Sequence, residues 1–145
     1  MLLTRASILA MLIVCLLVSA CGGTSKAPLV VSDIVITAPI PGRHMSAGYL
    51  TLTNNTDEAI SISRVVSPQF EAVEIHESLL EDGVAKMRHI PELSIPPNST
   101  ASLAPDGKHL MLMRPTGSID VVTLNFYSGT SMLLEVAAPV SQRNQ

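Results

Sequence analysis

Residues 73–89 read VEIHESLLEDGVAKMRH and contain two short strand-like runs on either side of the dipeptide Asp82-Gly83. Alternation of apolar and polar residues with a period of two is typical of β-strands, because successive side chains point to opposite faces of a sheet. An Asp-Gly pair between two such runs favours a two-residue hairpin turn of the primed type. The stretch therefore predicts an antiparallel pair formed by residues 73–78 and 84–89.

The rest of the chain shows the same pattern of short strand-like runs. Proline, glycine, asparagine and aspartate separate the runs at a spacing typical of a β-sandwich, and no long helix is indicated. With the hairpin, the predicted strands cover residues 29–37, 49–53, 60–66, 73–78, 84–89, 100–103, 109–113, 121–127 and 132–136. We expect one all-β domain.

The composition argues against a nucleic-acid binder and against a disordered protein. The chain has 145 residues, with 9 Lys and Arg against 12 Asp and Glu, and only two Tyr and two Phe. A nucleic-acid binder needs a basic surface for phosphates and aromatic rings for bases, and this chain is poor in both. Hydrophobic residues make up 47% of the chain, enough for a globular core.

The first 21 residues, MLLTRASILAMLIVCLLVSAC, are organised as a secretory signal peptide, with one cation, a short apolar run and small residues before Cys21. The apolar run is about half of the ~20 residues that a spanning helix needs. The ending of this segment resembles a bacterial lipobox, in which the cysteine is acylated and becomes the first mature residue. The alternative is an ordinary secretory signal with a cysteine near its end.

Together, the lipobox and the strand-like runs predict four parts of the chain: a signal peptide at 1–20, the lipidated Cys21 with a flexible tether at 21–28, a β-sandwich domain at 29–140 and a C-terminal tail at 141–145. The protein is then a bacterial periplasmic lipoprotein, anchored to a membrane by its lipid. The folded domain keeps no free thiol, because Cys15 leaves with the signal and Cys21 carries lipid. Any metal in the domain is therefore held without thiolate.

Soft donor side chains gather in residues 109–113, which read HLMLM. In a strand, residues i and i+2 share a face, so His109, Met111 and Met113 point one way. Leu110 and Leu112 point the other way and can fill the core.

Four donors, His76, Met87, His109 and Met111, have the spacing H-x10-M-x21-H-x-M. This spacing is the motif of the PCuAC family, which the chain resembles over most of the predicted domain, with similar strings at residues 47–54, 73–77 and 109–113. The resemblance implies a cupredoxin-like Greek-key β-sandwich that binds copper as Cu(I). It also implies that these four residues are the ligands, and that the ion is carried towards the CuA centre of cytochrome c oxidase.

The chemistry of the four side chains agrees with the resemblance. Thioether sulfur is a soft, neutral donor that suits Cu(I) and binds hard cations badly, and imidazole is intermediate. Zinc normally recruits thiolate or carboxylate, calcium and magnesium require a cage of oxygens, and a blue-copper centre requires cysteine. Two imidazoles with two thioethers therefore predict a mononuclear Cu(I) site.

Four further residues could extend this ligand set. His44 and Met45 lie in an early Pro-Gly loop, and His89 lies close to Met87 in the sequence. Each of the three is either an auxiliary copper donor, used in loading or transfer, or an exposed loop residue. Met113 is either a spare donor or a packing residue. Met132 lies in an apolar run and is expected in the core.

The predicted function is that of a monomeric, non-enzymatic Cu(I) carrier. It hands the ion by ligand exchange to an apo-acceptor, for which the resemblance implies the CuA subunit of cytochrome c oxidase. The alternatives are a copper-sequestering or copper-dependent redox lipoprotein without a delivery role, and a structural lipoprotein with incidental soft donors. An enzyme would need a poised acid or base, and no Ser-His-Asp, His-Glu-x-x-His or Cys-x-x-Cys arrangement is present in the sequence.

Overall fold

The computed structural model describes residues 26–39 and 42–141, which form eleven β-strands and no helix. The all-β prediction is confirmed. Within these residues, no helix has the length and apolar character required to cross a membrane. The strands are β1 (Leu29–Thr37), β2 (Met45–Asn54), β3 (Ile60–Ile62), β4 (Arg64–Val66), β5 (Phe70–Glu81), β6 (Val84–Ile90), β7 (Leu93–Ile95), β8 (Thr100–Leu103), β9 (Lys108–Pro115), β10 (Val121–Ser128) and β11 (Ser131–Ser141).

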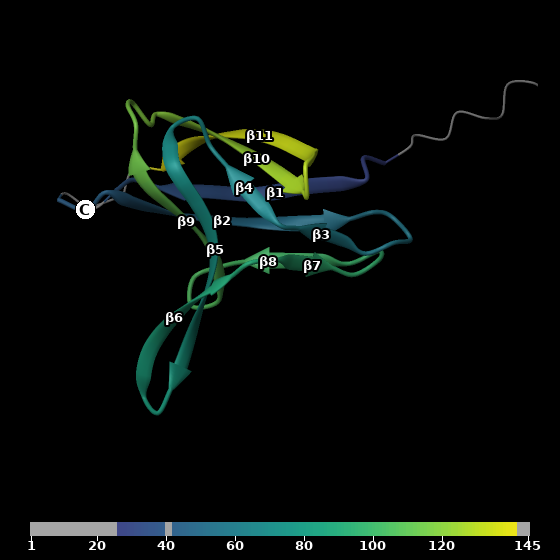
Figure 1. Ribbon diagram of the computed structural model, residues 1–145, viewed down its shortest axis with the longest axis horizontal. Helices are drawn as coiled ribbons and strands as arrows, with labels where there is room; N and C mark the ends of the chain where they lie inside the picture. The colour runs from purple at the N-terminus through teal and green to yellow at the C-terminus, as the bar shows by residue number, and fades with distance from the viewer. Residues whose placement is uncertain (1–25, 40–41, 142–145) are drawn as a thin grey trace, which may run out of the picture.

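The main sheet closes on itself. Its strands follow the order β1-β11-β10-β4-β5-β9-β2, and β2 pairs back to β1 (Figure 1). β8 pairs with the second half of β2, β6 pairs with β5 outside the ring, and β3 and β7 form a separate two-stranded sheet. The parallel pairing of β1 with β11 and the non-sequential strand order bring distant parts of the chain together.

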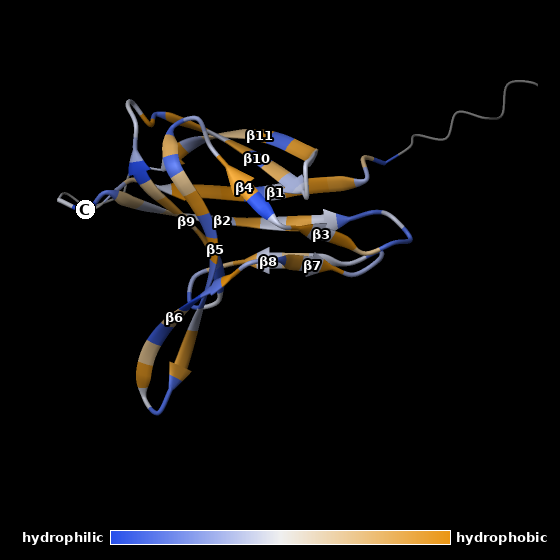
Figure 2. Ribbon diagram, viewed as in Figure 1, coloured by the Kyte–Doolittle hydropathy of each residue, from blue (hydrophilic) through white to orange (hydrophobic). Residues whose placement is uncertain are grey.

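The core lies inside this closed sheet, and strand alternation supplies its side chains. β2 alternates buried and partly exposed residues along most of its length, and β1 and β4 are largely hydrophobic (Figure 2). On β9, Leu110 and Leu112 are fully buried, as predicted, which leaves His109 and Met111 for the opposite face. A Cβ on Gly48 of β2 would come within 3.2 Å of both leucines, so glycine permits close packing of β2 on the core.

The predicted hairpin is present as β5 and β6. Glu81 pairs with Val84, which leaves Asp82 and Gly83 as a two-residue loop with φ of 53° and 77°. Positive φ at both positions is the primed turn that the Asp-Gly pair predicts. The hairpin projects from the rest of the molecule (Figure 1), and β6 is exposed along nearly all of its length.

Three short strands, β3, β4 and β7, differ from the prediction. Residues 60–66, expected as one strand, divide at Ser63 into β3, which pairs with β7, and β4, which pairs with β5 and β10. The backbone N–H of Ser63 donates to the carbonyl of Tyr127 at 2.9 Å. The local pattern does not predict β7, because its three residues lie between prolines, yet Leu93 and Ile95 are buried.

The prediction that Met132 belongs to the core is wrong. Its side chain is 57% exposed near the start of β11. The register between β10 and β11 shifts by one residue between two neighbouring pairs, Phe126 with Leu134 and Tyr127 with Met132. Such a bulge inserts a residue into one strand and interrupts the alternation of faces, so the apolar run does not predict which face Met132 takes.

The predicted terminal segments lie mostly outside the described residues. This is true of the signal peptide at 1–20, of Cys21 and of tail residues 142–145. Ser141, expected in the tail, is the last residue of β11 and pairs with Thr37. The end of the predicted tether is bound to the domain, because Asn55 donates hydrogen bonds to the carbonyls at positions 27 and 28.

Candidate metal centre

Strand register places three histidines in one row. His76 of β5 lies directly opposite His89 of β6 on one side and His109 of β9 on the other. The ring centroids of His76 and His89 are 5.6 Å apart, and those of His76 and His109 are 6.3 Å apart. Residues far apart in the sequence thus become neighbours across three adjacent strands.

The motif methionines lie on either side of this row. Met87 of β6 is opposite Ser78 of β5, and Met111 of β9 is opposite Glu74 of β5. Directly opposite residues share a face of the sheet, and residues two apart on one strand also share it. The four residues of the predicted motif therefore lie on one face of the β6-β5-β9 sheet.

A pocket of about 310 Å³ adjoins this face. Its lining includes the donor residues Met45, Met87, His109 and Met111. Met45, expected in a loop, is instead the first residue of β2. His76 does not line the pocket, although its ring is a neighbour of His109. Asp106 and Tyr49 also line it, and no spacing in the sequence points to either residue.

The remaining predicted donors occupy different places. His89 belongs to the histidine row and, with Glu74, lines a second pocket of about 190 Å³. His44 is exposed before β2, and its carbonyl accepts a hydrogen bond from the backbone of Arg114. Met113 is partly buried and pairs with Met45. The structure thus brings Met45 and His89 to the motif residues and leaves His44 outside both pocket linings.

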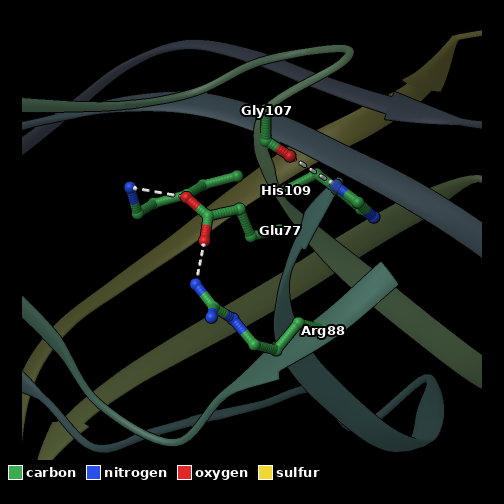
Figure 3. Close-up of polar contacts among 5 residues, drawn as sticks. Glu77, Arg88, Gly107 and His109 are labelled. Carbon is green, nitrogen blue, oxygen red and sulfur yellow. Dashed lines mark hydrogen bonds and ion pairs between the residues drawn. The ribbon is translucent and has the colours of Figure 1, made fainter. Parts of the chain in front are cut away.

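Two hydrogen bonds orient the motif histidines. Nδ1 of His109 lies 3.0 Å from the carbonyl oxygen of Gly107, which can only accept, so Nδ1 donates and Nε2 remains free (Figure 3). Nε2 of His76 lies 2.8 Å from Oε2 of Glu74, while Nδ1 of His76 is buried with no hydrogen-bond partner among the described residues. Burying an unpaired polar atom costs about 1–3 kcal/mol, so this nitrogen suits a site that a bound ion completes.

The acidic side chains near the row differ in their partners. The hydrogen bond from His76 is the main cause that lowers the pKa of Glu74, and the nearby charge of His89 lowers it further. Hydrogen bonds from Arg88, at 2.8 Å, and from Lys108 lower the pKa of Glu77 (Figure 3). By strand alternation Glu77 lies on the face opposite His76, so Glu74 is the carboxylate that faces the donors.

The four motif residues offer two imidazoles and two thioethers on this face. In the part of the chain that the structure describes, no group of three or more His, Cys, Asp and Glu side chains is arranged to hold a metal ion. Thioethers beside imidazoles favour a soft cation such as Cu(I) over zinc, calcium or magnesium.

Comparisons with solved structures identify the fold. The structure described as "Copper-bound PCuAC domain from PmoF2" has a TM-score of 0.65 and 17% sequence identity, covering 82% of this chain and 97% of that chain. The solution structure of CuI-DR1885 from Deinococcus radiodurans has a TM-score of 0.63 and 27% identity, covering 86% and 85%. The predicted resemblance to PCuAC domains and the cupredoxin-like sandwich are confirmed.

Comparison with protein families identifies the family. The family described as "Putative lipoprotein LpqE-like" matches residues 29–140, which is most of the chain. Comparison with curated proteins gives no match. The chain therefore belongs to the LpqE-like family.

Proposed function

We propose that this protein binds one Cu(I) ion through His76, Met87, His109 and Met111 and passes it to an apo-acceptor protein. The observation that carries the proposal is the strand register, which gathers two imidazoles and two thioethers on one face. Two proteins of the same fold support it, since one is described as copper-bound and the other as a CuI form.

The positions of the four donors suit a carrier that must release its ion. His109 is buried and Met111 is partly buried, on a strand paired on both sides. Met87 is 56% exposed on β6, the outer strand of the hairpin. An incoming ligand can therefore replace the Met87 sulfur first, while the more buried donors still hold the ion.

A competition titration with a Cu(I)-specific chelator tests copper binding. The wild-type protein should take up one equivalent of Cu(I), and His76→Ala should bind at least about tenfold more weakly, a loss of about 1.4 kcal/mol. Met132→Ala is the matched control, because Met132 is an exposed methionine of β11 outside the motif. X-ray absorption should show mixed sulfur and nitrogen neighbours; a shell of nitrogen and oxygen alone would exclude the methionines.

The acceptor to which the protein delivers its Cu(I) is, as the resemblance suggests, the CuA subunit of cytochrome c oxidase. Mixing the Cu(I)-loaded protein with an apo-CuA domain should produce the spectrum of the filled CuA centre once an oxidant is supplied. Retention of the copper by the carrier would instead favour the sequestering role.

Attachment to a periplasmic membrane through lipid on Cys21 is also proposed. The family description as a lipoprotein supports it, together with the signal-like segment before Cys21. Stable anchoring needs more than one acyl chain. Mass spectrometry of membrane fractions should detect an acylated N-terminal cysteine, and an unmodified soluble periplasmic protein would contradict the assignment.

A further inference from the structure

The two motif histidines are held by opposite nitrogens of their rings. His109 donates from Nδ1 to the Gly107 carbonyl, whereas His76 contacts Glu74 through Nε2. A carboxylate only accepts hydrogen bonds, so the Nε2 of neutral His76 carries the proton. The unprotonated nitrogens are then Nε2 of His109 and Nδ1 of His76.

The Gly107 carbonyl is held in place by backbone hydrogen bonds to β5 and within its own loop. It also accepts a hydrogen bond from the backbone N–H of Ser78 on β5 at 3.0 Å, and the N–H of Gly107 donates to the carbonyl of Ala104 at 3.2 Å. The acceptor for His109 therefore belongs to the loop between β8 and β9 and is held to β5 by this bond. The acceptor for His76, by contrast, is the half-exposed side chain of Glu74.

We infer that Glu74 and the Gly107 carbonyl are positioning groups that present Nδ1 of His76 and Nε2 of His109 to the metal ion. This inference rests on the proposed function, because it names the ligand atoms of the same site. Histidine ligands commonly donate their other ring N–H to a carboxylate or a backbone carbonyl, which fixes the tautomer and the orientation of the ring. An independent observation supports this assignment: Nδ1 of His76 is buried and has no hydrogen-bond partner among the described residues, which suits an atom that binds the ion.

Substitution of Glu74 tests its positioning role. Loss of such a partner typically weakens metal binding 10- to 100-fold, and Glu74→Ala should lower Cu(I) affinity by about that factor. Glu74→Gln retains an oxygen acceptor for the Nε2 proton. Its loss of Cu(I)-binding free energy should therefore be at most half of the loss in Glu74→Ala. Glu71→Ala is the control for charge, because Glu71 is an exposed β5 carboxylate that pairs with Arg114.

Nitrogen-15 NMR of the histidine rings tests the assignment without copper. At pH 8, above the ordinary histidine pKa of about 6.5, the apo protein should show a protonated Nε2 in His76 and a protonated Nδ1 in His109. Addition of Cu(I) should then shift the resonances of His76 Nδ1 and His109 Nε2. The opposite tautomer in either ring would overturn the inference.

The two experiments separate this inference from the proposed function. If wild-type protein binds no Cu(I), the proposed function fails, and with it the assignment of ligand atoms. If Cu(I) binds with full affinity to Glu74→Ala, or shifts the opposite nitrogens, the inference fails and the proposed function remains. Should the alanine variant not fold, the wild-type and Glu74→Gln spectra still decide the assignment.

Discussion

Replacing Met111 by leucine removes one sulfur donor and keeps a side chain of nearly the same volume. Met111 is partly buried on β9, opposite Glu74 of β5 and Ala47 of β2. Exchange of methionine for leucine usually costs less than about 1.5 kcal/mol of stability, so the fold should survive. Loss of one of four donors should weaken Cu(I) binding at least about tenfold, or about 1.4 kcal/mol.

The weaker binding should be visible in thermal unfolding at a buffered concentration of free Cu(I). An ion that binds only the folded state adds about 2.7 kcal/mol when its free concentration is 100 times Kd, and a tenfold weaker site leaves about 1.4 kcal/mol. Copper should therefore stabilise Met111→Leu about half as much as wild type. Met132→Leu is the matched control. If copper stabilises the two variants equally, Met111 is not a ligand.

Three further outcomes are expected. Replacing His44 and Met45 together by alanine should leave Cu(I) affinity within about threefold, because neither residue belongs to the motif. Transfer to an apo-acceptor, measured by stopped flow, should become slower if the two residues act as auxiliary donors; an unchanged rate would exclude this role. Leu110→Ala empties a fully buried position behind the site and should lower the free energy of unfolding in urea by about 2–5 kcal/mol; a loss near zero would contradict the described core. Glu77→Gln should make the stability of the fold less sensitive to acid. Hydrogen bonds from Arg88 and Lys108 lower the pKa of Glu77 from its ordinary value of 4.5, so the stabilisation by its carboxylate is complete above that pH and is lost as the pH falls through the folded pKa. The same acid unfolding profile in both proteins would exclude this contribution.

Local sequence was sufficient for the features that depend on neighbouring residues. Asp82-Gly83 predicted the hairpin, because a two-residue primed turn is determined by the positive φ of its own residues. The alternation at residues 109–113 predicted that Leu110 and Leu112 face the core, because the period of a strand is local. The spacing of four donors likewise pointed to the fold that the solved relatives share.

The tertiary structure decided which distant side chains meet. Pairing of β5 with both β6 and β9 aligns His76 with His89 and His109, and no local pattern specifies that register. Pairing of β2 with β9 brings Met45 to the pocket. The division of residues 60–66 and the pairing of β7 also depend on distant partners.

Face and orientation were likewise decided by contacts beyond the local chain. A bulge opposite Tyr127 leaves Met132 exposed although it lies in an apolar run, because one inserted residue interrupts the alternation of the strand. The orientation of His109 depends on a loop carbonyl anchored to β5. The sequence thus predicted the strands of the four motif side chains, whereas long-range register determined which side chains lie together, and hydrogen bonds to Glu74 and the Gly107 carbonyl determined which ring nitrogen His76 and His109 leave free.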